Sequence, residues 1–142
     1  MVRSGTRQDA EAVLALWTAA GAEPSVTDDI ASIWALLAHD PRALIVAELD
    51  GEIVASLIAG FDGWRANMYR LAVHPRVRRQ GLGSELVAEA ERRFVLCKIR
   101  RSSALVVTER SEAVSFWESA GYARDRRIGR HVKNLDGAPE RG

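Results

Sequence analysis

The sequence contains few of the residues that build disulfides, metal sites and membrane spans. Its 142 residues include a single cysteine, Cys97, which excludes an intramolecular disulfide and a cysteine-rich metal site. The three histidines, His39, His74 and His131, lie far apart without the spacing of metal ligands, so we expect no metal. No run of about 18 apolar residues is present, which excludes a transmembrane helix.

A secretion signal is also missing from the N-terminal segment, because Asp9 and Glu11 interrupt the apolar stretch that such a signal requires. Together with one reduced cysteine, this predicts a cytoplasmic protein without a membrane partner. Hydrophobic residues make up 47% of the chain and charged residues 27%, as in ordinary globular proteins. The length suits one domain, which we expect over residues 1–135, with a disordered tail over residues 136–142.

The formal net charge is only +1, but the charges are unevenly distributed. Residues 1–64 contain 3 Lys and Arg residues against 10 Asp and Glu, whereas residues 65–101 contain 10 against 3. The basic middle segment suggests contact with an anion, such as a phosphorylated cofactor, a nucleic acid or an acidic partner. A solvated, arginine-rich helix face explains the same pattern equally well, so charge alone does not decide between them.

Hydrophobic periodicity and turn residues predict alternating helices and strands. The elements expected in the first half are a helix over residues 12–20, a helix over residues 30–37 capped by Thr27 or Asp28, and a hairpin over residues 44–61 with its turn at Asp50–Gly51. The elements expected in the second half are a strand over residues 69–73, a long helix opened by Gly81–Gly83, a strand over residues 103–107, a helix over residues 111–120 and one or two closing strands over residues 122–132. This order predicts a mixed α/β domain with a largely antiparallel sheet.

The segment between the central strand and the long helix has the form of an anion-binding loop. Gly81 and Gly83 open the helix, whose N-terminus presents unpaired N–H groups and a partial positive charge. Glycine also lets a backbone approach an anion closely. The segment has neither the Gly-Lys-Ser/Thr of a Walker loop nor the third glycine of a dinucleotide fingerprint. Formal positive charge is added by Arg76, Arg78 and Arg79.

Two motifs give the sequence a resemblance to a known family. Arg78-x-x-Gly81-x-Gly83, following Leu71–Pro75, resembles the acetyl-CoA signature of the GCN5-related N-acetyltransferases (GNAT). Ala113-x-x-Phe116-Trp117-Glu118-x-x-Gly121-Tyr122 is similar to the late helix-and-strand motif of that family, and residues 61–65 are similar to a small bacterial subgroup. The resemblance covers nearly the whole chain. It implies a GNAT-like fold, in which a central, mostly antiparallel sheet has splayed fourth and fifth strands and is flanked by four helices.

The resemblance also implies a site for acetyl-CoA in the gap between the strands over residues 68–74 and 103–107. Backbone groups of Leu71 and Val73 would pair with the pantetheine amides as an added strand would. Backbone N–H groups from Arg79 to Ser84 would hold the pyrophosphate, and Arg76 or Arg78 would contact the 3′-phosphate. The residues assigned in this way to the cofactor are Leu71, Ala72, Val73, Arg78, Arg79, Gln80, Gly81, Leu82, Gly83, Ser84, Arg110, Ala113, Phe116 and Trp117.

The activity implied is acetyl transfer from acetyl-CoA to a primary amine of a small molecule, a protein N-terminus or a lysine. A neutral amine would attack the thioester directly through a tetrahedral intermediate. A strand N–H near Val73, freed by a bulge, would stabilise the oxyanion, and a base would keep the amine neutral. The candidates for catalytic groups are Asp62, Tyr69, Glu109 and Tyr122, although a solvated turn is the favoured interpretation for Asp62 and a surface carboxylate for Glu109.

The sequence departs from the family pattern at two positions. Trp117 stands where a tyrosine often protonates the leaving thiolate, and Arg110 stands where an asparagine is often found. Three interpretations stay open: transfer without a protein acid, a substitute hydroxyl from Tyr69 or Tyr122, or a catalytically weak acyl-CoA-binding sensor. Nucleic-acid binding ranks last, because the basic loop lacks interleaved aromatic residues. A homodimer through the late strands is a further expectation from the resemblance.

Overall fold

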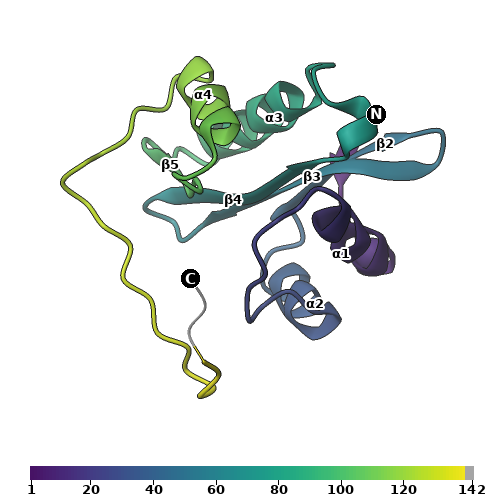
Figure 1. The fold of residues 1–142 in the computed structure, drawn as a ribbon, viewed down its shortest axis with the longest axis horizontal. Coiled ribbons are helices and arrows are strands. Elements are labelled where there is room, and N and C mark those ends of the chain that lie inside the picture. The colour runs from purple at the N-terminus through teal and green to yellow at the C-terminus, as the bar shows by residue number, and fades with distance from the viewer. Residues whose placement is uncertain (140–142) are drawn as a thin grey trace.

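One five-stranded sheet crosses the middle of the protein, and helices cover both of its faces (Figure 1). The computed structural model describes residues 1–139. The strands follow one another across the sheet in chain order: β1 (Val2–Ser4), β2 (Leu44–Leu49), β3 (Glu52–Phe61), β4 (Ala66–Val73) and β5 (Ser102–Ala104). The helices are α1 (Ala10–Ala19), α2 (Ile30–His39), α3 (Leu82–Leu96) and α4 (Ser111–Ser119). All neighbouring strands are antiparallel except β4 and β5, which confirms the predicted mixed α/β fold class.

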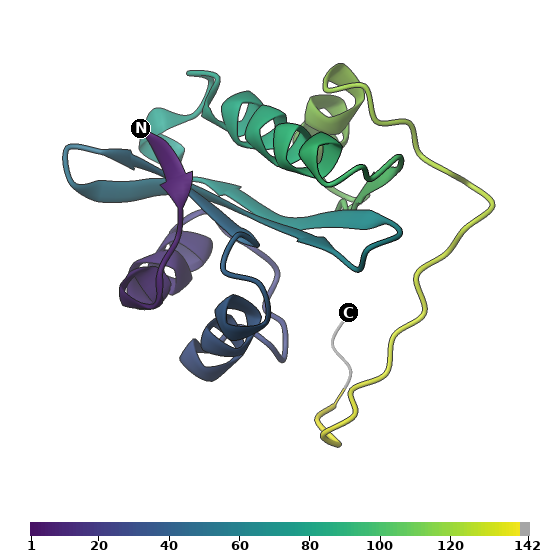
Figure 2. The same ribbon diagram turned by 180° about the vertical axis from the view of Figure 1, so that it is seen from behind.

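Both faces of the sheet are buried, with α1 and α2 on one side and α3 and α4 on the other (Figures 1 and 2). Successive strand residues point to opposite faces, so β2 sends Leu44 and Val46 toward α1 and α2, and Ile45 and Ala47 toward α3. This double coverage explains why the hairpin strands are almost continuously apolar. No helix within residues 1–139 is long and apolar enough to cross a membrane.

Local sequence chemistry explains the hairpin and most helix ends. Asp50 and Gly51 both adopt left-handed backbone conformations, with φ of 52° and 79°, as the predicted two-residue turn requires. The expected cap of α2 is wrong by one or two residues. Asp29, rather than Thr27 or Asp28, is the N-cap, and its carboxylate accepts a hydrogen bond from the Ser32 N–H at 2.7 Å.

The predicted closing strands over residues 122–132 are wrong, since this segment contains turns but no strand and leads away from the sheet (Figure 1). Four consecutive residues, 124–127, are charged, so the segment has no alternating apolar face to bury against the core. Ile128 and Val132 are 73% and 52% exposed. The expected disordered tail begins at Asp136: residues 136–139 contain no helix or strand, and residues 140–142 lie outside the described residues.

Candidate active site

The pairing of β4 with β5 ends after three residues, and this opens a gap in the sheet. Ala66, Asn67 and Met68 pair with β5, and the Leu105 N–H donates to the Met68 carbonyl at 2.9 Å. β4 then continues to Val73 without a strand partner on that side within residues 1–139. The splay predicted between the fourth and fifth strands is therefore present.

Backbone groups of Leu71 and Val73 face this gap. The His74 N–H donates to the Val54 carbonyl of β3 at 2.8 Å, so the preceding residue, Val73, points away from β3. Leu71, two residues earlier, points the same way. An extended ligand lying in the gap would therefore find backbone donors and acceptors on β4, as an added strand does.

A bulge in β4 lies directly before these groups. Ser56 pairs with Ala72 but Ile58 pairs with Tyr69, so Arg70 and Leu71 together lie opposite one residue of β3. Arg70 has a φ of 58°, in the left-handed region that favours glycine. A side chain in this region costs about 1–2 kcal/mol. The bulge expected near Val73 thus lies two to three residues earlier in the strand.

The predicted phosphate loop leads from the end of β4 to the N-terminus of α3. Gly81 is the N-cap of α3 with a φ of 81°, and a Cβ placed there would meet no atom within 4 Å. Open space therefore lies beside Gly81 at the N-terminus of α3, the end of a helix at which an anion would bind. Gly83 serves packing instead, because a Cβ would lie 3.1 Å from the Phe116 ring of α4.

Arg78 and Arg110 both contact the C-terminal end of α1. Arg78 donates to the Ala20 carbonyl at 3.1 Å and to the Val73 carbonyl at 3.3 Å, and so bridges α1 and β4. Arg110 donates to the Gly21 carbonyl at 2.6 Å and pairs with Glu23 at 3.1 Å. Carbonyls at a helix C-terminus carry partial negative charge, which explains the attraction. Both predicted cofactor residues are thus bound to the α1 end, and Arg78 also contacts β4 beside the gap.

Three more of the predicted cofactor residues, Ala113, Phe116 and Trp117, lie on α4. Trp117 is only 5% exposed, and its ring packs edge-on against Phe116 at 5.3 Å and Tyr122 at 5.2 Å between ring centroids. Its indole N–H makes no hydrogen bond within residues 1–139. Every fully buried side-chain nitrogen or oxygen in that part of the chain has a hydrogen-bond partner. Because the indole N–H has none, it keeps some contact with solvent. Ala113 lies one turn before Phe116 on the same helix.

The four catalytic candidates do not converge on one point. The Tyr122 hydroxyl donates to the Glu91 carboxylate at 2.7 Å and lies 3.2 Å from the Ser102 hydroxyl. Burial raises the pKa of Tyr122 to about 12, and the hydrogen bond to Glu91 acts in the same direction. Tyr69 packs on the opposite face of the sheet, among residues of the α1 and α2 core.

The two acidic candidates are surface residues. Asp62 closes the turn between β3 and β4, at the other end of β4 from Val73. Its carboxylate accepts hydrogen bonds from the N–H groups of Arg65 and Trp64 at 2.9 and 2.8 Å, and these lower the pKa of Asp62. Glu109 is exposed in the segment that joins β5 to α4, near the gap. Of the two, only Glu109 lies on an element that borders the gap.

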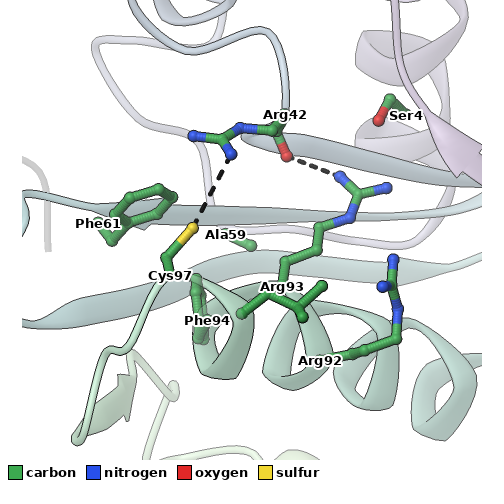
Figure 3. A pocket seen from close by; sticks show the side chains of 9 residues that line it. Ser4, Arg42, Ala59, Phe61, Arg92, Arg93, Phe94 and Cys97 are labelled. Atoms are coloured by element: carbon green, nitrogen blue, oxygen red, sulfur yellow. Dashed lines mark hydrogen bonds between the residues drawn. The ribbon is translucent and has the colours of Figure 1, made fainter.

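A separate pocket of about 290 Å³ lies at the opposite end of α3 from Gly81 (Figure 3). Its floor is apolar, and Arg42, Arg92 and Arg93 line it. Arg42 donates to the Cys97 sulfur at 3.8 Å, and Arg93 donates to the Arg42 carbonyl at 2.8 Å. The pocket contains none of the predicted cofactor residues, so the gap in the sheet is the candidate active site.

Comparison with known proteins shows the family to which the chain belongs. Residues 10–122, which include both sides of the gap, match the Acetyltransferase (GNAT) family. The chain belongs to the GNAT family. It is an N-acetyltransferase by this membership, and acetyl-CoA is the typical co-substrate of the family.

Individual GNAT relatives resemble the chain over most of its length. An acetyltransferase of Pectobacterium atrosepticum is 31% identical over 121 residues, which cover 85% of this chain and 86% of the relative. The crystal structure of Ard1 from Thermoplasma volcanium has a TM-score of 0.78 at 22% identity and covers 87% of this chain and 82% of its own. The PaiA N-acetyltransferase of Thermoplasma acidophilum, solved in complex with coenzyme A, has a TM-score of 0.71 at 16% identity, with coverages of 84% and 86%.

Proposed function

We propose that this GNAT protein transfers an acetyl group from acetyl-CoA to a primary amine of a small molecule, a protein N-terminus or a lysine. The observation that carries the proposal is the gap beside β4, where backbone groups of Leu71 and Val73 lie next to the N-terminus of α3. The proposal includes a cytoplasmic location, which the free thiol of Cys97 supports.

The residues around the gap fit coenzyme A in their chemistry. The backbone of Leu71 and Val73 would pair with the pantetheine amides, and the half-exposed side chains of Leu105 and Val107 offer an apolar wall. The space at Gly81 in front of α3 would receive the pyrophosphate.

The chemistry required of the protein is modest. A neutral amine attacks the thioester carbonyl directly, and the N–H of Leu71 at the bulge would stabilise the oxyanion of the tetrahedral intermediate. One such donor contributes roughly 3–4 kcal/mol in other enzymes. Glu109, which is exposed in the segment that joins β5 to α4, would accept the amine proton through water.

We infer that the thiolate leaves without a protein acid. The Tyr122 hydroxyl is engaged by Glu91, Tyr69 lies on the α1 and α2 face, and the indole of Trp117 cannot give up a proton. A thiol has a pKa of roughly 8.5, so its thiolate is a tolerable leaving group at neutral pH. The alternative is a catalytically weak acyl-CoA sensor, which the tryptophan at position 117 favours. Turnover above about 1 s⁻¹, within the usual enzyme range, would exclude the sensor.

A thermal melt with acetyl-CoA, coenzyme A and ATP, each at millimolar concentration, tests the cofactor site. A ligand at about 100 times its Kd stabilises the folded state by roughly 2.7 kcal/mol, which raises Tm by several degrees for a chain of this size. We expect shifts with both coenzyme A species and none with ATP. Equal shifts with ATP, or no shift, would contradict the proposal. A positive result leads to a screen for thiol release with polyamines, aminoglycosides and peptides.

Replacing Tyr122 by Phe should lower stability but leave acetyl transfer within about twofold. The lost hydrogen bond to Glu91 contributes about 1 kcal/mol. The pKa of Tyr122 is raised to about 12 in the folded state, so its neutral phenol stabilises the folded state fully below pH 10. This stabilisation is lost as the pH rises from 10 toward 12. Urea unfolding at pH 8 and pH 11 should show a smaller pH effect in the variant than in the wild type. A large loss of turnover in the folded variant would instead make Tyr122 the missing acid.

A further inference from the structure

The bulge in β4 decides which backbone groups enter the gap. Ala66 and Met68 face β5, since the Ala66 N–H donates to the Arg101 carbonyl at 3.1 Å and the Met68 carbonyl accepts from Leu105. Regular alternation would then turn residues 70 and 72 toward the gap. The extra residue shifts this pattern by one, so that Leu71 and Val73 face the gap instead. The conformation of Arg70 therefore sets the direction of the Leu71 N–H.

Arg70 is held in this conformation by partners from outside the strand. Its guanidinium pairs with the Asp28 carboxylate at 2.7 Å and lies 5.3 Å from the ring centre of Trp17. Both charged side chains are largely buried, with 17% of Arg70 and 21% of Asp28 exposed. Asp28 is itself fixed, because it accepts a hydrogen bond from the Ser25 N–H at 2.9 Å. The ion pair thus joins an arginine in the left-handed region to a carboxylate from the loop between α1 and α2.

We propose that Asp28 is a positioning residue for acetyl transfer. By holding Arg70 at the bulge, it directs the Leu71 N–H toward the acetyl carbonyl, and it couples the loop between α1 and α2 to the oxyanion site. The inference rests on the proposed function, because it names the residue that shapes that same site. Glycine adopts the left-handed region freely. Arg70→Gly therefore permits the bulge without the ion pair, and it should make Asp28 dispensable.

The test compares wild type, Asp28→Asn, Arg70→Gly, the double variant and Glu23→Gln. Glu23 is the matched control, an acid of the same loop that pairs with Arg110 instead of Arg70. The readout is the amide resonance of Leu71 in ¹⁵N-labelled protein, recorded with coenzyme A and with acetyl-CoA. The two ligands differ only in the acetyl group, so the difference between the two spectra reports the contact with the acetyl carbonyl. Thermal melts confirm that each variant is folded.

We expect the Leu71 amide resonance to show a distinct acetyl-dependent shift in the wild type and in Glu23→Gln. This shift should be lost in Asp28→Asn. It should return in the double variant, which adds Arg70→Gly to Asp28→Asn. A shift that persists in Asp28→Asn, or one that glycine at position 70 does not restore, would overturn the inference. So would the absence of any acetyl-dependent shift in a wild-type protein that binds both ligands. Failure of the wild type to bind coenzyme A at all would overturn the proposed function itself.

Discussion

Gly81→Asp should weaken coenzyme A binding at least about 100-fold, whereas Gly81→Asn should weaken it far less. Gly81 has a left-handed backbone, which Asn and Asp tolerate better than other residues with side chains. Neither Cβ would clash, since no atom lies within 4 Å. The two side chains are nearly equal in size, so they differ mainly in charge. A carboxylate about 5 Å from a phosphate charge costs roughly 3 kcal/mol at an effective dielectric constant of 20, which corresponds to about 100-fold in affinity.

Isothermal titration calorimetry with coenzyme A measures this effect directly. Circular dichroism and a melt without ligand should show that both variants fold and differ little in stability, because Gly81 is exposed and precedes the helix. Wild-type affinity in both variants would place the phosphates away from α3. A comparable loss in both variants would mean that the backbone conformation, and not the charge, governs binding.

The parts of the site that depend on neighbouring residues were predictable from the sequence. Gly81 follows a strand and three arginines, and it begins an amphipathic helix, so its place at the N-terminus of α3 is a matter of local chemistry. The hairpin turn at Asp50–Gly51 was predictable for the same reason. The resemblance to the GNAT family then supplied the splay between β4 and β5, which no local pattern indicates.

The features that depend on distant partners were not predictable. Nothing in the sequence of β4 shows that Arg70 takes a left-handed conformation, because its stabilising partners are Asp28 and Trp17, more than 40 residues away. Asp28 was assigned instead to a helix cap, which fits its local sequence equally well. The contacts of Arg78 and Arg110 with the α1 end are likewise long-range.

The charged segment after Tyr122 gave a wrong prediction for a related reason. Arginines are compatible with an edge strand, where their charge protects the strand against aggregation. A run of charged residues also leaves a strand without an apolar face to bury against the core. The structure shows the second outcome: residues 124–127 are charged and the segment leads away from β5. The expected homodimer was to form through strands over residues 122–132, and residues 1–139 contain no strand there. The homodimer itself stays a prediction.

Trp117→Ala should lower the stability by about 3–5 kcal/mol, the usual cost of removing a buried aromatic side chain. Trp117 is 5% exposed and holds Phe116 and Tyr122 in edge-on contacts, so its removal leaves a cavity where α4 meets the sheet. Tm should fall by about 10 °C or more. Denaturant unfolding checks the free energy. A loss below about 1 kcal/mol would show that Trp117 contributes to the ligand site and not to the core.

The same position tests the chemistry when the variants keep an aromatic ring. Trp117→Tyr and Trp117→Phe both refill part of the space and differ only in a hydroxyl, so their ratio of kcat values isolates a proton donor from packing. If the thiolate leaves unaided, the kcat values of the two variants should agree within about threefold when both are measured at pH 7 with the same amine. A kcat about ten times higher in the tyrosine variant than in the phenylalanine variant would show that protonation of the leaving group limits turnover. General acid catalysis can produce a rate effect of this size or larger. That result would make the natural tryptophan the reason for slow transfer, and it would favour the sensor over the enzyme.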